Sequence, residues 1–198
     1  EPPRQRYLTD DEARRLWQVL EEQEAQPTSS DAPLAFKLLL LTGRRLGEIQ
    51  NMRWEHVDFA NGRLRLPDSK VGARSFWLSD AVIKLLTRLR SERFGEAAAE
   101  GYIVRGKQPD SPFNGFEKAW QRIRSDADIE DVRIHDLRHS YASFAAAAGA
   151  STVELRDQLG HSSLQTTHQY AHLADKALHS SVNHIGQKLE SMLTTKDQ

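Results

Sequence analysis

Hydrophobic and polar residues follow mostly a helical period along this chain. Near its start, Thr9 and Glu12 form the capping-box pattern that opens a helix. The apolar residues behind this box recur at the spacing of one buried helix face: Ala13, Leu16, Trp17 and Leu20. A second helix is predicted over about 31–41, and because it is apolar on most sides we expect it to be buried. Gly43 is expected to end it, before a third helix begins near Leu46.

The next segment changes to the alternating period of β-strands. Three short runs show this period: EHVDF, GRLRLP and RSFWLS. Asn61 with Gly62 separates the first two runs, and a turn over 70–72 separates the last two. The pattern predicts a small antiparallel sheet with Lys70 at the tip of its second hairpin.

Helical periodicity returns in the second half of the chain. Helices are predicted over about 79–93 and 113–123, with a mixed loop between them, and shorter helices follow from His135 onward. Glycines end two of these and capping pairs open the later ones: Gly149, Gly160, Ser151 with Glu154, and Ser162 with Gln165. A last amphipathic segment covers about 175–193. We therefore predict a mainly α fold with a small three-stranded antiparallel β-sheet, as a single domain over 1–198.

The composition narrows the class of protein. A chain of 198 residues is long enough for one domain with a sizeable core. Cysteine is absent, which excludes disulfides, thiolate metal sites and a cysteine nucleophile. No apolar run approaches the length that spans a membrane, so we expect a cytoplasmic protein. The chain begins at Glu1 rather than Met, and we expect that upstream sequence was cut away.

An ordered series of polar residues carries the candidate chemistry: Arg45, Lys70, His135, Arg138, His161 and Tyr170. His135 and Arg138 are three apart, so on a helix they project from one face and can address one ligand. Two arginines suit a phosphodiester, because guanidiniums donate bidentate hydrogen bonds where negative charge accumulates. Tyr170 can attack phosphorus once its hydroxyl, with an ordinary pKa of about 10, loses its proton. We predict His135 as the base, Lys70 as the proton donor to a leaving 5′ hydroxyl, and His161 as a hydrogen-bond partner of the phosphate.

These residues lie in segments that resemble the tyrosine recombinases, the phage integrase family. The matching segments are TGRRLGEI, the hairpin with Ser69 and Lys70, HDLRH, LGH and the final tyrosine. The resemblance implies the catalytic-domain fold of these DNA breaking and rejoining enzymes, with Tyr170 as nucleophile. It implies cleavage of double-stranded DNA to a 3′-phosphotyrosine and resealing by a partner 5′ hydroxyl, with no metal, ATP or other cofactor.

The resemblance also implies a biological setting and partners. It implies site-specific recombination that integrates or excises a mobile element, in a bacterial or phage-infected cell. The expected assembly is a homotetramer on synapsed DNA sites, with a monomer when free, room for accessory DNA-bending proteins and no membrane partner. We expect a C-terminal helix within 175–198 to pack on its own domain or to dock on a neighbouring protomer.

Two departures from the family pattern bear on packing and on DNA affinity. Arg44 stands where many relatives carry an apolar residue, and we expect the usual amino-terminal DNA-binding domain to be absent from residues 1–198. The net charge of −1 is low for a DNA-binding protein. The segment from Arg44 to Arg74, however, contains seven basic residues and four acidic ones, so one surface of the protein can be basic. We expect this piece alone to bind DNA modestly.

Other functions are compatible with parts of the pattern. A type IB topoisomerase uses a similar constellation, and a DNA-binding module that has lost catalysis would retain some of it. His135 with His139, and His168 with His172, have the spacing of helical zinc ligands, although the neighbouring arginines repel a cation.

Several conspicuous residues are interpreted as structural or supporting. The four tryptophans are expected in the core or in interfaces: Trp17, Trp54, Trp77 and Trp120. Glu48 and Asp136 are interpreted as groups that orient the catalytic side chains, and His139 as a helix histidine or a support of the site. Three other tyrosines are rival nucleophiles in principle: Tyr7, Tyr102 and Tyr141.

Overall fold

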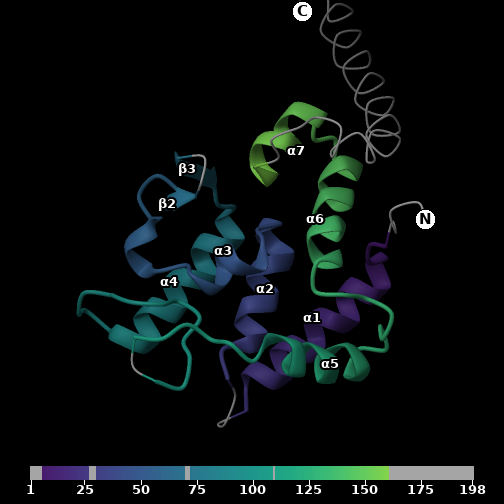
Figure 1. Cartoon of the computed structure of the whole chain (residues 1–198), viewed down its shortest axis with the longest axis horizontal. Coiled ribbons are helices and arrows are strands. Elements are labelled where there is room, and N and C mark those ends of the chain that lie inside the picture. Colours follow the sequence, from purple (N-terminus) through teal and green to yellow (C-terminus); the bar gives the residue numbers. More distant parts are fainter. Residues whose placement is uncertain (1–5, 27–29, 70–71, 109, 161–198) are drawn as a thin grey trace, which may run out of the picture. The chain divides into compact units, whose positions relative to one another are not determined.

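The structure is a computed structural model that describes residues 6–26, 30–69, 72–108 and 110–160 (Figure 1). Contacts divide the chain into two compact units, Glu1–Tyr141 and Ala142–Gln198. Three of the predicted catalytic residues, Lys70, His161 and Tyr170, lie outside the described residues, as do the helices predicted after Gly160. The first unit contains the other three.

Helix α1 (Asp10–Glu24) begins at the predicted capping box. The Thr9 hydroxyl accepts the Glu12 amide at 3.3 Å, and the Glu12 carboxylate accepts the Thr9 amide at 2.8 Å. Arg6 binds the carboxylates of Glu12 and Asp131 at 2.6–3.0 Å, which ties the start of the chain to the loop before α6. Helix α1 packs against α2 and α5.

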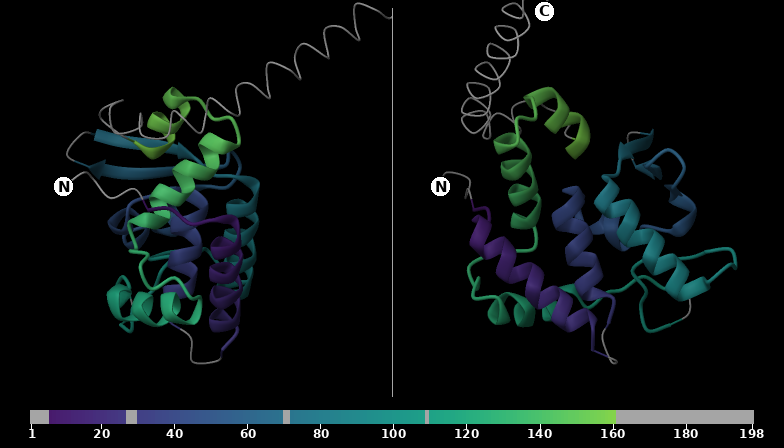
Figure 2. Two further views of the ribbon diagram at one scale, coloured as in Figure 1. Left: turned by 90° about the vertical axis from the view of Figure 1, so that its right-hand side faces the viewer. Right: turned by 180° about the vertical axis from the view of Figure 1, so that it is seen from behind.

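Helix α2 (Ala32–Thr42) is the buried centre of the first unit, as its apolar sequence predicts. It lies between α1 and α4 (Figure 2) and nearly all of its residues are buried. Gly43 ends it with φ at 63°, a left-handed conformation that glycine adopts without a Cβ clash, and its amide donates to the Leu39 carbonyl. The short helix α3 (Leu46–Gln50) follows immediately.

The predicted sheet is present and antiparallel, in the order β1 (Val57–Asp58), β2 (Arg63–Ser69) and β3 (Gly72–Trp77). A short 3₁₀ helix, η1 (Trp54–His56), precedes it. Leu64 pairs with Phe76 on the buried face, and Arg63 pairs with Trp77 on the opposite face. Of the two places predicted for Trp77, the core is therefore excluded: its side chain is 59% exposed, with the Arg63 guanidinium 3.9 Å from its ring centroid. A place in an interface stays a prediction.

Helix α4 (Asp80–Phe94) lies within about one residue of the predicted range, and the Ser79 side chain caps its start. Helix α5 (Phe116–Asp126) begins three residues later than predicted. The reason is that Phe113 still belongs to the preceding extended segment, where its amide donates to the Val104 carbonyl at 3.1 Å. Trp120 on α5 is buried and packs on Phe36 of α2, with ring centroids 4.9 Å apart.

Helix α6 (Asp136–Ala147) begins in the first unit and continues into the second. Within the second unit, α7 (Thr152–Leu159) opens on the predicted capping box of Ser151 with Glu154, and Gly160 ends it with φ at 67°. In the described part of the chain, no helix has both the length and the apolar character needed to cross a membrane.

Candidate active site

Arg45 lies at the junction between α2 and α3. Its backbone is extended, because Gly43 has already ended α2. Glu48, in the first turn of α3, accepts the Arg45 amide at 2.9 Å and the Arg45 Nη1 at 3.3 Å. The Arg45 side chain remains 47% exposed, so its guanidinium is accessible to a ligand. Glu48 therefore orients Arg45, as predicted.

Arg138 reaches the same junction from α6. Its side chain is buried, and Nη1 donates a 2.6 Å hydrogen bond to the carbonyl oxygen of Gly43. Gly43 is two residues before Arg45, so the bond holds the second arginine beside the segment that carries the first. A charged donor to a buried carbonyl is among the stronger hydrogen bonds in a protein.

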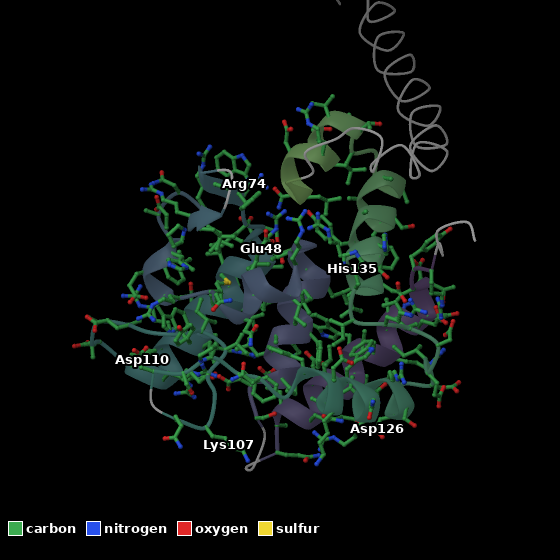
Figure 3. The ribbon with its side chains drawn as sticks, in the orientation of Figure 1. Glu48, Arg74, Lys107, Asp110, Asp126 and His135 are labelled. Carbon is green, nitrogen blue, oxygen red and sulfur yellow. The ribbon has the colours of Figure 1, made fainter. Side chains whose placement is uncertain are left out.

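His135 lies directly before α6 rather than within the helix, so the expectation of two residues on one helix face needs correction. His135 is nevertheless held close to Arg138, because the His135 carbonyl accepts a hydrogen bond from the Arg138 amide at 3.1 Å. Figure 3 shows His135 at the start of α6 and Glu48 on α3. Burial is the main cause that lowers the pKa of His135, and the positive charges of Arg138 and Arg45 lower it further. The negative charge of Asp136 opposes this shift. The imidazole is therefore neutral near pH 7 and can accept a proton.

His139 supports His135 directly. The two rings meet edge to face with centroids 5.0 Å apart. Burial lowers the pKa of His139, and the neighbouring His135 lowers it further. Both imidazoles thus favour the neutral form.

The turn before His135 is held by α5. Trp120 Nε1 donates to the Val132 carbonyl at 2.9 Å, and Arg124 Nη1 lies 3.5 Å from the same oxygen. Asp136 accepts the amide of Arg133 at 2.8 Å. Asp136 therefore fixes the backbone that leads to His135, which is how it orients the site.

These elements enclose a cavity of about 340 Å³ in the first unit. Its ionisable lining is mostly basic: Arg44, Arg124, Arg133, His135, Arg138 and the single acid Glu117. Such a lining favours an anion over a cation. Among the described residues, no group of three or more His, Cys, Asp or Glu side chains is placed to hold a metal ion. The second histidine pair of the zinc hypothesis, His168 with His172, lies outside those residues.

The arginine-rich site agrees with the comparison to known families. The model of the phage integrase family matches residues 6–177. The chain belongs to this family. A shufflon-specific DNA recombinase of Escherichia coli is 31% identical over 172 residues, which cover 86% of this chain and 41% of the relative. This integrase-family chain thus spans less than half the length of that recombinase.

Solved structures show the same fold as this phage integrase family member. The crystal structure of XerA recombinase has a TM-score of 0.70 at 24% identity, and the match covers 93% of this chain and 65% of that one. The catalytic domain of bacteriophage HP1 integrase has a TM-score of 0.63 at 23% identity, covering 91% of this chain and 95% of that domain. The prediction of a recombinase catalytic-domain fold, mainly α with a small antiparallel sheet, is confirmed.

In this integrase-family chain the structure brings together three of the six predicted site residues, Arg45, His135 and Arg138. The positions of the other three stay predictions, because they lie outside the described residues. Sequence reasoning missed the contributions of Arg124 and Arg133 to the cavity. The available signal was weak: Arg133 lies two residues before His135, but Arg124 lies eleven residues before it.

Proposed function

We propose that this chain is the catalytic domain of a site-specific tyrosine recombinase that cleaves and rejoins double-stranded DNA. The carrying observation is the hydrogen bond from Arg138 to the Gly43 carbonyl, which places the second arginine beside the segment of Arg45. A neutral His135 adjoins both. Membership in the phage integrase family, and a relative named as a DNA recombinase, support DNA as the substrate.

Arg45 and Arg138 bind the scissile phosphate in this proposal. Negative charge on the nonbridging oxygens grows as phosphorus becomes pentacoordinate, so donors fixed beforehand stabilise the transition state more than the ground state. Arg138 is fixed by its bond to Gly43, and Arg45 is held by Glu48. His161 donates a further hydrogen bond to the phosphate.

The covalent step transfers the phosphoryl link from DNA to the enzyme. The Tyr170 oxygen forms a bond to phosphorus while the bond from phosphorus to the 5′ oxygen breaks. His135 takes the proton of the Tyr170 hydroxyl, and Lys70 gives a proton to the leaving 5′ oxygen. The products are a 3′-phosphotyrosine and a free 5′ hydroxyl.

Rejoining runs the same step in reverse with a partner strand. The phosphotyrosine conserves the energy of the phosphodiester, so a 5′ hydroxyl of a second DNA can attack phosphorus and release Tyr170. No ATP, metal or other cofactor is needed for this balance. The biological outcome we propose is integration or excision of a mobile element.

The proposed assembly follows from exchange between two DNA duplexes. Strand exchange at two sites requires four active protomers, so we propose a homotetramer on synapsed DNA and a monomer when free. Residues 1–198 supply catalysis, and the helix expected within 175–198 packs on its own domain or docks on a neighbour. Accessory DNA-bending proteins fit this arrangement.

Trapping on a nicked suicide substrate tests the proposal. Cleavage near the nick releases a short oligonucleotide that diffuses away, so the covalent protein–DNA adduct accumulates. We expect an adduct with the wild-type chain in EDTA and none with Tyr170→Phe. An adduct that forms with Tyr170→Phe contradicts the nucleophile, and loss of the adduct in EDTA contradicts metal independence. Relaxation of a supercoiled plasmid that lacks a recombination site would instead indicate type IB topoisomerase activity.

A further inference from the structure

Arg44 is a buried arginine between Gly43 and Arg45. It is 1% exposed, and its guanidinium carbon lies 3.6 Å from the centroid of the Phe76 ring on β3. Its Nε, Nη1 and Nη2 atoms are all buried, and in the structure as described none of them has a hydrogen-bond acceptor. A guanidinium carries five N–H donors and a permanent charge, so this is a costly arrangement.

The charges around Arg44 have opposing effects on its pKa. Burial lowers its pKa to about 10; Glu48 opposes the shift, whereas the charges of Arg138 and Arg45 contribute to it. The face of Phe76 offsets part of the desolvation through a cation–π contact. The structure therefore holds three guanidiniums close together, and the central one has no hydrogen-bonded counter-charge within the described part of the chain.

We propose that Arg44 is a third cation of the phosphate site, which has no hydrogen-bond acceptor among the described residues and gains a second counter-charge, beside Glu48, when an anionic phosphate ester enters. Its nitrogens are covered, so it acts as a charge at a distance rather than by touching the phosphate. Buried charges interact more strongly than exposed ones, because water screens them less. An arginine whose guanidinium nitrogens have no acceptor among the described residues is thus stabilised further when an anion occupies the site.

The nature of the site favours a phosphate ester as the anion. Arg44 lines the same basic cavity as His135 and Arg138, and an oxyanion there faces several donors and one acid. This inference rests on the proposed function for the source of the phosphate, which is a DNA phosphodiester. Inorganic phosphate shares the chemistry and separates the two questions experimentally.

The first test measures stabilisation by inorganic phosphate. The melting temperature of the 198-residue chain is compared in phosphate and in chloride at equal ionic strength, for wild type, Arg44→Met and Lys37→Met. Lys37 is a matched control, because it is also a buried cation but already binds Glu24 at 2.6 Å. We expect phosphate to raise the melting temperature of wild type and Lys37→Met equally, and Arg44→Met to lose about half of the rise or more. An equal rise in all three proteins overturns the proposal.

The second test removes the charge from the substrate. Single-turnover cleavage is measured on DNA with a phosphodiester or an uncharged methylphosphonate at the scissile position. We expect Arg44→Met to slow cleavage of the phosphodiester by roughly 10- to 100-fold, and that of the methylphosphonate by less than about 3-fold. An equal loss on both substrates means that Arg44 acts only through packing, which overturns the proposal.

The two tests separate this inference from the proposed function. If wild type cleaves neither substrate but Arg44 governs the phosphate effect, the proposed function fails and the inference stands. If wild type cleaves DNA while Arg44→Met keeps the full phosphate effect and loses equally on both substrates, the inference fails and the function stands.

Discussion

The guanidinium of Arg138 donates a 2.6 Å hydrogen bond to the carbonyl oxygen of Gly43. This bond joins residues 95 positions apart and fixes α6 to the turn that ends α2. Because Arg45 follows that turn, this contact holds Arg138 beside the segment of the other candidate phosphate-binding arginine. The donor is charged and buried, so no water can replace the bond cheaply.

Replacing Arg138 by lysine keeps the charge but removes the planar fork. A lysine cannot hold the Gly43 carbonyl and donate two parallel hydrogen bonds to a phosphate at once. We expect Arg138→Lys to reduce the rate of adduct formation by roughly 100-fold or more in single-turnover assays. Arg124→Lys is the control, because Arg124 makes a longer contact, 3.5 Å, to the Val132 carbonyl. We expect this variant to lose less of the rate of adduct formation. Equal rates for Arg138→Lys and wild type would contradict the role of the bond.

Releasing Arg45 from Glu48 tests the orientation of the exposed arginine. Glu48→Gln weakens the contacts to the Arg45 amide and Nη1, so we expect cleavage to slow by about 10-fold. The pair is partly exposed, so the free energy of unfolding should fall by less than about 1 kcal/mol. Glu55→Gln breaks a comparable surface pair with Arg53 and is expected to leave cleavage unchanged. If both variants cleave alike, Glu48 does not orient Arg45.

Trp120 and Trp54 form a matched pair for testing the turn before His135. Both are buried, but Trp120 Nε1 donates to the Val132 carbonyl, whereas Trp54 Nε1 has no partner among the residues described. We expect Trp120→Phe to lower the free energy of unfolding by about 1–2 kcal/mol beyond the loss caused by the smaller side chain, because the Val132 carbonyl loses its indole donor. The variant should also slow cleavage. Trp54→Phe should lack this extra loss. Urea unfolding and single-turnover cleavage measure the two effects, and equal results for both variants would refute the role of the indole hydrogen bond.

The lowered histidine pKa values predict acid sensitivity. Burial is the leading cause for His56, His135 and His139, so below pH 6.5 the unfolded chain binds protons that the folded chain does not. Stability is therefore retained above about pH 6.5 and falls as the pH drops from there toward the folded pKa values. Urea titrations at pH 7.5 and 5.5 should show this loss, and His139→Gln should reduce it. Unchanged stability between the two pH values would contradict the direction of the shifts.

The same shift predicts the pH dependence of cleavage. As a base, His135 must be neutral, and because its pKa is lowered it becomes half protonated only at a pH below 6.5. At subsaturating DNA, where the rate reports the free protein, the acidic limb should have its midpoint below 6.5. A midpoint above 6.5 would argue against His135 as the base.

Local signals in the sequence predicted the frame of the site correctly. The end of α2 at Gly43, the Thr9 capping box and the antiparallel pairing of the three strands have local sequence signals, and the structure confirms each of them. The start of α5 was misplaced, because Phe113 bonds to Val104, a contact that depends on the path of the preceding loop. The exposure of Trp77 was missed because a tryptophan in an alternating strand resembles a core residue, although its register put it on the outer face.

The electrostatic character of the site could be predicted only in part from the sequence. The order of Arg45, His135 and Arg138 indicated a phosphate site, but burial of Arg44 could not be inferred, since arginine usually marks the surface. The hydrogen bond from Arg138 to the Gly43 carbonyl also has no sequence signal, because every residue has a backbone carbonyl. Three-dimensional packing decided both features.

Identification of the residue that becomes attached to DNA tests the central claim most directly. The adduct trapped on a nicked suicide substrate is digested with nuclease and protease, and the modified peptide is sequenced by mass spectrometry. Tyrosine recombinase chemistry at this site predicts a phosphotyrosine at Tyr170, in the peptide that follows His161. Attachment at Tyr141, Tyr7 or Tyr102, or the absence of any adduct with DNA that carries the cognate site, would contradict it.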